Sequence, residues 1–319
     1  MRANRSTSVF SGKAAPLLLG AIGVACFSMT FPATTAAEAS FSPIEVGVGR
    51  SVIAVLVAVS ALALRRQPLL PPRTAFPRIL IVAGPVGIGF GLVSALALHY
   101  VDSVHGAVLT GLIPAATAGM AVWRAGERPR AAYWAALAFG LAIVIGFAIV
   151  QGGGSLHLAD LLLLLAIGIA GIGYAEGGAL AREYGGWRVI CWAVIIAAPV
   201  TVPITAAAVI ADPPAHVTGS AVAGLCYVGV VSMVLGFFAW YHAMAVGGVA
   251  RVGRLQLAQP ALTLGWSALL LGEHVSWLSA GAAAAVIAAT AVGRNARVDV
   301  VAPAASGQAR PVPLTAPSS

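Results

Sequence analysis

The sequence predicts an all-α integral membrane protein with ten transmembrane helices, arranged as two inverted repeats of five helices each. The composition, a series of apolar segments and an internal repeat carry this prediction. Of the 319 residues, 60% are hydrophobic and only 9% are charged, and the mean hydropathy is +0.94. A soluble globular protein has about 25% charged residues. This chain lacks the charges that would solvate a water-facing surface, so we expect it to lie in a lipid bilayer.

Ten apolar segments are long enough to cross the hydrocarbon core, which takes about 20 residues of α-helix. They are residues 15–36, 46–64, 79–99, 104–123, 131–150, 159–181, 189–210, 221–244, 252–271 and 276–293. Stretches rich in Pro, Gly or Arg separate them, such as RRQPLLPPR after the second and QGGGS after the fifth. These loops are short, so we expect no soluble domain between the spans.

The basic residues indicate how the spans are oriented. If the amino terminus is cytoplasmic, 17 of the 18 Lys and Arg residues fall on the cytoplasmic side, and Arg50 is the exception. Because basic residues gather in cytoplasmic loops, we expect both termini inside the cell and the chain in the inner or plasma membrane. Residues 1–14 would then form a cytoplasmic segment, and residues 294–319 a disordered cytoplasmic tail. The basic residues are scattered and form no single patch, which argues against nucleic acid as a partner.

The amino terminus also has features of a secretory signal peptide. Arg2, Arg5 and Lys13 precede the first apolar segment, and the small residues TTAAEAS follow it. The apolar part of a signal is usually about 7–15 residues long. This segment is longer, so we expect it to remain as the first span.

No pattern typical of an enzyme, a metal site or a cofactor site occurs in the sequence. HExxH, GxSxG and Walker motifs are absent, so we expect no catalysis, no cofactor and no ATP hydrolysis by this chain. The three cysteines lie in apolar segments, where we interpret them as small apolar side chains. Five of the six histidines fall on the outer side, and without an HxxH spacing we interpret them as polar loop residues rather than as metal ligands.

The chain contains an internal repeat. A shift of 146 positions superposes five pairs of residues. The pairs are Pro114 and Pro260, Gly126 and Gly272, Glu127 and Glu273, Thr110 and Gln256, and Thr117 and Thr263. We assign the first copy to residues 15–150 and the second to residues 151–293. Because five spans are an odd number, the second copy enters the membrane from the opposite side, as in many secondary transporters.

The second copy resembles the repeat signature of the drug/metabolite transporter superfamily, in its EamA-like branch. In that signature a proline in mid-span is followed by Gly-Glu and then by another Gly, here Pro260, Gly272, Glu273 and Gly281. The first copy has the proline and the Gly-Glu pair but Ala135 in place of the later Gly. The segment FPATTAAEASFSPIEVGVGR, which ends at Arg50, is also similar to the family. The resemblance implies a ten-helix transporter with a central cavity between the repeats, and it names no solute.

Glu176 is the ionisable residue that lies well inside a predicted span. A carboxyl group there is costly unless it faces protein or water. It is therefore a candidate cavity residue that couples transport to protons or binds a cation, or else it reaches the cytoplasmic boundary near Arg182. Gly173 and Gly177 lie beside it, which leaves room either for a closely packed helix or for a ligand.

Polar residues form matching stripes on the fourth and ninth spans, and they are candidates for a cavity wall. These residues are Thr110, Thr117, Gln256, Gln259 and Thr263. Hydrogen bonding between helices is the alternative interpretation. Pro114 and Pro260 lie within the stripes and cannot donate the helical hydrogen bond. We interpret them as candidate hinges.

Three further groups of residues have alternative interpretations. Trp240, Tyr241 and Tyr174 either line the cavity as a stacking wall or belong to the aromatic belt at the membrane surface. Arg50 pairs with Glu45 or with lipid headgroups, or it has the functional role that the family resemblance implies. Gly126, Glu127, Gly272 and Glu273 are family-motif residues at helix ends, where the glutamates either stabilise a turn or contact the solute.

The predicted function is secondary active transport. The resemblance implies an exporter of small metabolites, such as amino-acid-like or nucleoside-like solutes, or of drugs, working by alternating access. A passive channel or a non-transporting structural membrane subunit is the alternative. The sequence leaves open the solute, the coupling to protons, and whether the chain forms a homodimer; its expected partners are a small solute and the lipid bilayer.

Overall fold

The computed structural model describes residues 15–125, 128–129, 131–248, 252–295 and 298–299. These residues are almost entirely helical. The α-helices of the first copy are α1 (Ala15–Ser28), α2 (Thr30–Glu38), α3 (Pro43–Leu64), α4 (Phe76–Val82), α5 (Phe90–Leu98), α6 (Ser103–Thr110), α7 (Ile113–Ala125) and α8 (Ala131–Gln151). Those of the second copy are α9 (Leu158–Tyr184), α10 (Gly186–Ala211), α11 (Gly219–Cys226), α12 (Phe237–Gly247), α14 (Gln259–Trp266) and α15 (Trp277–Asn295).

Four short segments have other helical geometries. The π-helices η1 (Ala83–Gly89), η2 (Tyr227–Gly236) and η4 (Ser267–Leu271) and the 3-10 helix η3 (Gly253–Ala258) continue or precede an α-helix. The two longer π-helices lie in equivalent places, because a shift of 146 positions puts the whole of η1 within η2. Single turns of π-helix are frequent at functional sites.

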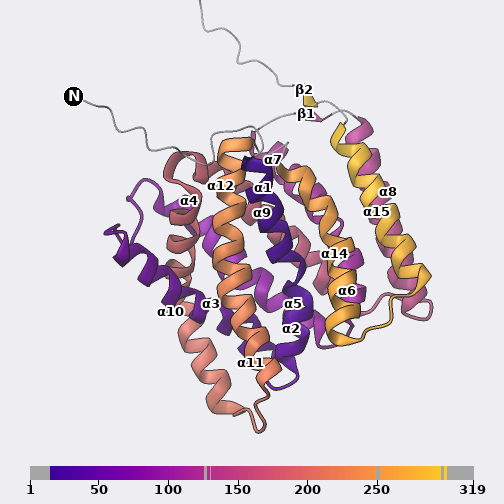
Figure 1. The fold of residues 1–319 in the computed structure, drawn as a ribbon. Helices are drawn as coiled ribbons and strands as arrows, with labels where there is room; N and C mark the ends of the chain where they lie inside the picture. Colours follow the sequence, from indigo (N-terminus) through magenta and orange to yellow (C-terminus); the bar gives the residue numbers. More distant parts are fainter. Residues whose placement is uncertain (1–14, 126–127, 130, 249–251, 296–297, 300–319) are drawn as a thin grey trace, which may run out of the picture.

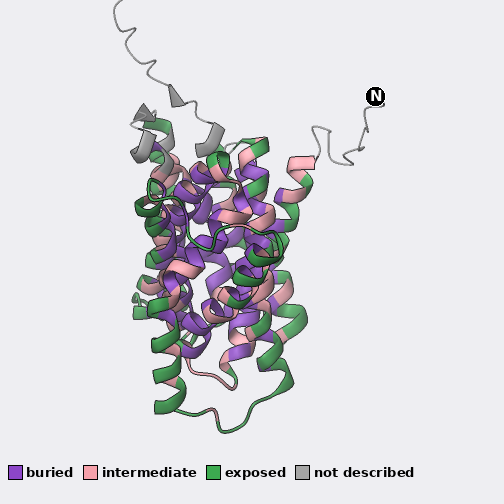
Figure 2. Cartoon of the chain, turned by 90° about the vertical axis from the view of Figure 1, so that its left-hand side faces the viewer, coloured by how far each residue is buried: buried purple, intermediate pink, exposed green. Residues whose placement is uncertain are grey.

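Seven helical stretches of the described residues are long and apolar enough to cross a membrane. The other three predicted spans are interrupted or shorter. One consists of α6 and α7, another consists of η3, α14 and η4, and the third is the shorter helix α15. Large apolar side chains such as Leu56, Phe139 and Leu269 are more than 60% exposed, as expected of a surface that meets lipid. Figure 2 shows the buried residues gathered in the middle of the bundle.

One pair of equivalent segments of the two copies runs in opposite directions in Figure 1. The chain passes down the bundle from α4 to α5, whereas it passes up the bundle from α11 to α12. The helices α8 and α15 pack against each other at one side of the bundle, and α10 packs against α3.

Local sequence signals account for several helix ends. Ser42 and Glu45 form a capping box at the start of α3, and His157 and Asp160 form one at α9. Between α9 and α10 the chain turns at Gly185, whose φ of 85° favours glycine.

Two sequence expectations change at the ends of the bundle. Arg128–Pro129 (β1) pairs with Val298–Asp299 (β2) as a two-residue antiparallel ladder, so the chain is not purely helical. The sequence predicted a disordered tail from residue 294 onward. That start is too early, because α15 extends to Asn295 and β2 follows it. Residues 1–14 and 300–319, predicted to be cytoplasmic segments, lie outside the described residues.

Candidate functional site: a cavity between the two copies

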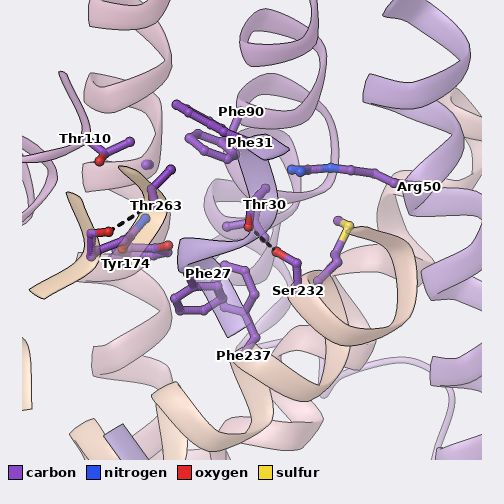
Figure 3. A pocket seen from close by; sticks show the side chains of 14 residues that line it. Phe27, Thr30, Phe31, Arg50, Phe90, Thr110, Tyr174, Ser232, Phe237 and Thr263 are labelled. Atoms are coloured by element: carbon purple, nitrogen blue, oxygen red, sulfur yellow. Dashed lines mark hydrogen bonds between the residues drawn. The ribbon is translucent and has the colours of Figure 1, made fainter. Parts of the chain in front are cut away.

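A cavity in the centre of the bundle has an empty volume of about 520 Å³, including the part open to solvent. Both copies contribute to its wall. The first copy supplies Phe27, Thr30, Phe31, Arg50, Val86, Phe90 and Thr110, and the second copy supplies Ala170, Tyr174, Ser232, Met233, Phe237, Gln259 and Thr263. Figure 3 shows these side chains converging from several helices. Within the described part of the chain, α8, α10 and α15 contribute no residue to the wall.

Equivalent residues of the two copies line this cavity. A shift of 147 positions superposes Val86 on Met233 and Phe90 on Phe237, and all four line the wall. In both copies the phenylalanine follows a π-helix that ends in glycine. The wider π-helical turn thus sets the direction of the same pair of side chains in each copy.

The first predicted span is broken at the cavity, between α1 and α2. Pro32 has no backbone N–H, so the carbonyl oxygen of Ser28 cannot receive its usual helical hydrogen bond. The hydroxyl of Thr263 donates to this oxygen at 2.8 Å, and the indole of Trp266 donates to the Ser28 hydroxyl at 3.1 Å. The break therefore joins the first span to the ninth, and places Thr30 and Phe31 in the wall.

Thr30 and Ser232 form a polar contact between the copies. Their hydroxyl oxygens are 2.7 Å apart, and both side chains are buried. Figure 3 shows this bond at the edge of the cavity, beside the rings of Phe31 and Phe237. Neither residue was among the sequence candidates.

Arg50 extends from α3 into the cavity (Figure 3) and is 5% exposed. The expected pairing with Glu45 is wrong, because Glu45 instead accepts a hydrogen bond from the backbone N–H of Ser42 at 2.7 Å. Lipid headgroups are not its partners either, since the guanidinium is enclosed by protein. It lies over the ring of Phe90, 5.4 Å from the ring centre.

Four of the nine sequence candidates line the cavity: Thr110, Tyr174, Gln259 and Thr263. The Thr110 hydroxyl donates to the backbone of its own helix, and the single proton of the Thr263 hydroxyl is shared between the carbonyls of Ser28 and Gln259. Thr117 donates to the carbonyl of Ile113 and, like Gln256, is buried away from the wall.

Trp240 and Tyr241 form a second layer behind the aromatic wall. They are 1% and 0% exposed, so the aromatic-belt interpretation is wrong for both. The Trp240 ring lies 6.2 Å from that of Tyr174, and the Tyr241 ring lies 5.0 Å from that of Phe237. The Tyr241 hydroxyl donates to the carbonyl of Gly173 at 2.9 Å, which fixes α12 against α9.

Glu176 lies outside the cavity wall, in an ion pair with Arg78. Its side chain is 2% exposed, and its Oε1 is 2.8 Å from Arg78 Nε. Arg78 also contacts Glu183 at 2.7 Å. Arg78, an arginine of α4, is a partner that the sequence did not suggest. The glycines beside Glu176 serve helix packing, since Gly173 contacts Val86 and Gly177 contacts Tyr241.

Glu273 stabilises the start of α6 and does not line the cavity. Its carboxylate accepts hydrogen bonds from the backbone N–H groups of Ser103, at 3.1 Å, and Val104, at 2.8 Å, and also from the Ser103 hydroxyl. Glu273 follows Gly272, whose φ is 68°. A motif residue of the second copy thus caps a helix of the first copy. Gly126 and Glu127, the equivalent motif residues, lie outside the described residues.

His105, on α6 of the first copy, also contacts the second copy. Its Nε2 lies 2.7 Å from Oδ1 of Asp160 on α9, and the two side chains are 11% and 3% exposed. The interpretation of His105 as a polar loop residue is therefore wrong. Together with Glu273, Asp160 ties the beginning of α6 to the second copy.

The two prolines of the repeat lie just after interruptions of their spans. Pro114 is in the first turn of α7, and Pro260 is in the first turn of α14. Proline is tolerated in a first turn because its missing N–H has no helical partner there. The interruptions themselves are the turn at residues 111–112 and the 3-10 helix η3.

The model for the EamA-like transporter family matches this chain twice, over residues 14–149 and 157–293. The chain belongs to the EamA-like transporter family. It is 42% identical over 276 residues to the uncharacterized transporter YdeK of Bacillus subtilis (strain 168), a match that covers 86% of this chain and 96% of the relative. A crystal structure of another protein has the same fold, with a TM-score of 0.61, 20% identity, and coverage of 88% of this chain and 96% of that one.

Membership in the EamA-like family makes the chain a multi-pass membrane transporter, and the family consists of transporters rather than enzymes. The double match agrees with the repeat found at a constant offset in the sequence. A small solute and membrane lipid are therefore its partners.

Proposed function

We propose that this protein is a secondary carrier that moves small solutes across the cell membrane through the central cavity, by alternating access. The observation that carries the proposal is the cavity itself, whose wall is built from equivalent residues of both copies. In transporters with inverted repeats, the binding site lies between the repeats near the middle of the membrane. Ten spans and an inverted second copy are part of the proposal, and the opposite directions of α4–α5 and α11–α12 support them.

Both termini are cytoplasmic in this proposal, and export is the net direction. The distribution of the basic residues supports the orientation. Labelling of cysteines introduced in the loops at residues 70 and 155, from one side of the membrane at a time, checks it. We expect residue 70 to be accessible from the cytoplasm and residue 155 from outside.

The proposal predicts solute counterflow in proteoliposomes. A carrier exchanges labelled external solute for unlabelled internal solute, whereas a channel equilibrates both without exchange. We expect counterflow with at least one member of a panel of amino acids, nucleosides and aromatic carboxylates. Conductance or leakage without counterflow for the whole panel would instead support a passive channel, and no movement would contradict transport.

The same assay tests the prolines as hinges. We expect Pro114→Ala and Pro260→Ala to slow counterflow, because alanine, unlike proline, supplies an N–H that would let the helix continue back through the interruption and make the span stiffer. Alanine is a good helix former, so both variants should insert and melt normally. Initial rates equal to those of the parent would assign these prolines to packing alone.

We propose that Glu176 anchors α4 to α9, whereas the sequence left open proton coupling, cation binding or a position at the cytoplasmic boundary. Glu176→Gln removes the charge that pairs with Arg78, and we expect it to destabilise the protein by about 1–3 kcal/mol, less than for a fully buried pair because Arg78 is 30% exposed. Glu183→Gln is the matched control, since Glu183 contacts the same arginine but is 49% exposed. Thermal melting measures both effects. Unchanged melting, together with loss of pH-gradient-driven uptake, would favour proton coupling.

A further inference from the structure

We propose that the cavity binds small organic carboxylates, with the carboxylate held by Arg50 and the apolar part of the solute held by the surrounding aromatic rings. This inference rests on the proposed function, because it assigns a substrate class to the transport cavity. It starts from a buried guanidinium that no group among the described residues neutralises.

Arg50 makes no ion pair or side-chain hydrogen bond with any described residue, and its Nε is buried without a hydrogen-bond partner. A buried cation in a membrane protein is costly unless an opposite charge or water compensates it. By contrast, Arg78 contacts two glutamates. The cation–π contact with Phe90 offsets part of the cost but uses none of the guanidinium N–H donors.

The position of Arg50 is built into the fold. A Cβ atom at Gly91 would lie 2.5 Å from Arg50 Nε and 2.9 Å from its Cζ, so the missing side chain at Gly91 makes room for the guanidinium. The guanidinium presents its N–H groups as a planar fork that matches the two oxygens of a carboxylate. A bound carboxylate would supply both the missing charge and the missing acceptors.

The rest of the wall favours an anion with an apolar body. No Asp or Glu is among the residues that line this cavity in the described part of the chain, so a cationic group on a solute would find no counter-charge. The rings of Phe31 and Phe90 stack at 6.2 Å, and Phe27 and Phe237 lie on the other side of the cavity. Such faces bind apolar or aromatic groups through dispersion and ring stacking.

The test uses purified full-length protein and three probes that share a phenyl ring and a two-carbon chain: phenylacetate, 2-phenylethanol and 2-phenylethylamine. They differ in carrying a negative, a neutral or a positive head group. We expect phenylacetate to raise the melting temperature and to bind about tenfold or more tightly than the other two, as a charge-assisted bidentate contact implies. Equal binding of all three probes would overturn the proposal.

Variants of Arg50 test whether this residue is responsible for the tighter binding of phenylacetate. Arg50→Gln should weaken phenylacetate binding about tenfold and leave 2-phenylethanol binding unchanged, and Arg50→Lys should lie between because it keeps the charge without the fork. Arg188→Gln is the control, since Arg188 lies over Trp192 and away from the cavity. Unchanged phenylacetate binding by Arg50→Gln would overturn the assignment. If that variant does not fold, the three probes on the parent protein still decide the question.

Two further stabilisation measurements identify the kind of anion that the site binds. Stabilisation by chloride or inorganic phosphate equal to that by phenylacetate would assign the site to inorganic anions. Stabilisation by phosphatidylglycerol alone would assign it to a lipid headgroup, and either result would overturn the proposal. Binding of phenylacetate through Arg50 without any counterflow would uphold this site and contradict only the transport function.

Discussion

Replacing Gly47 by Ala is expected to destabilise the protein by about 1–3 kcal/mol, the range for overpacking a close contact. At Gly47, α3 touches α5: a Cβ atom there would lie 2.7 Å from both the carbonyl oxygen of Gly91 and the Cα of Leu92. These are backbone atoms, which cannot rotate away as a flexible side chain would. The two helices must therefore separate, and because Gly91 also packs against Arg50, transport should fall together with stability.

Gly168→Ala is the control for this prediction. Gly168 lies in the middle of α9, and nothing lies within 4 Å of a Cβ atom placed there. Alanine also has the higher helix propensity, so this variant should melt at or above the temperature of the parent protein. Equal melting temperatures for Gly47→Ala and Gly168→Ala would show that the contact between α3 and α5 yields easily.

Replacing Glu273 by Ala is expected to destabilise the protein by about 2–3 kcal/mol, because it removes charge-assisted hydrogen bonds and a negative charge at a helix start. The backbone N–H groups of Ser103 and Val104 would lose their acceptor. The Ser103 hydroxyl would keep only its bond to Ser267, at 2.7 Å. Thermal melting and limited proteolysis of the loop before α6 measure the effect.

Asp102→Ala provides a matched control at the same helix start. Asp102 is the residue at which a capping side chain normally stands, yet it makes no side-chain capping bond here. We therefore expect little change on its removal. A larger loss of stability for Asp102→Ala than for Glu273→Ala would contradict the role of Glu273 as the cap of α6.

The sequence determined the features that depend on local composition. Apolar length and the punctuating loops predicted helical segments that the structure reproduces within a few residues. The constant offset between Pro114 and Pro260 predicted the repeat that the family match confirms. These features could be predicted because the bilayer requires long apolar helices, whatever their neighbours are.

The cavity wall could be predicted only in part. Thr110, Gln259 and Thr263 were found because polar residues in an apolar span stand out. Phe27, Phe90 and Phe237 were missed because phenylalanine is also favourable where a helix faces lipid. Pro32 was the available signal for the break in the first span, yet its effect depends on the hydroxyl of Thr263, more than 200 residues away in the chain.

Tertiary structure alone decided the partners of the charged side chains. Arg50 and Glu45 are five residues apart on one helix, and proximity in sequence suggested a pair, but one turns into the cavity and the other caps the helix start. Glu176 pairs with Arg78, 98 positions away in the sequence. Glu273 caps the start of α6, 170 positions away. In a membrane interior an uncompensated charge is costly, so the positions of Glu176 and Glu273 depend on the helices that supply their partners. Which helices meet depends on the packing of the whole bundle, and no local pattern in the sequence records it.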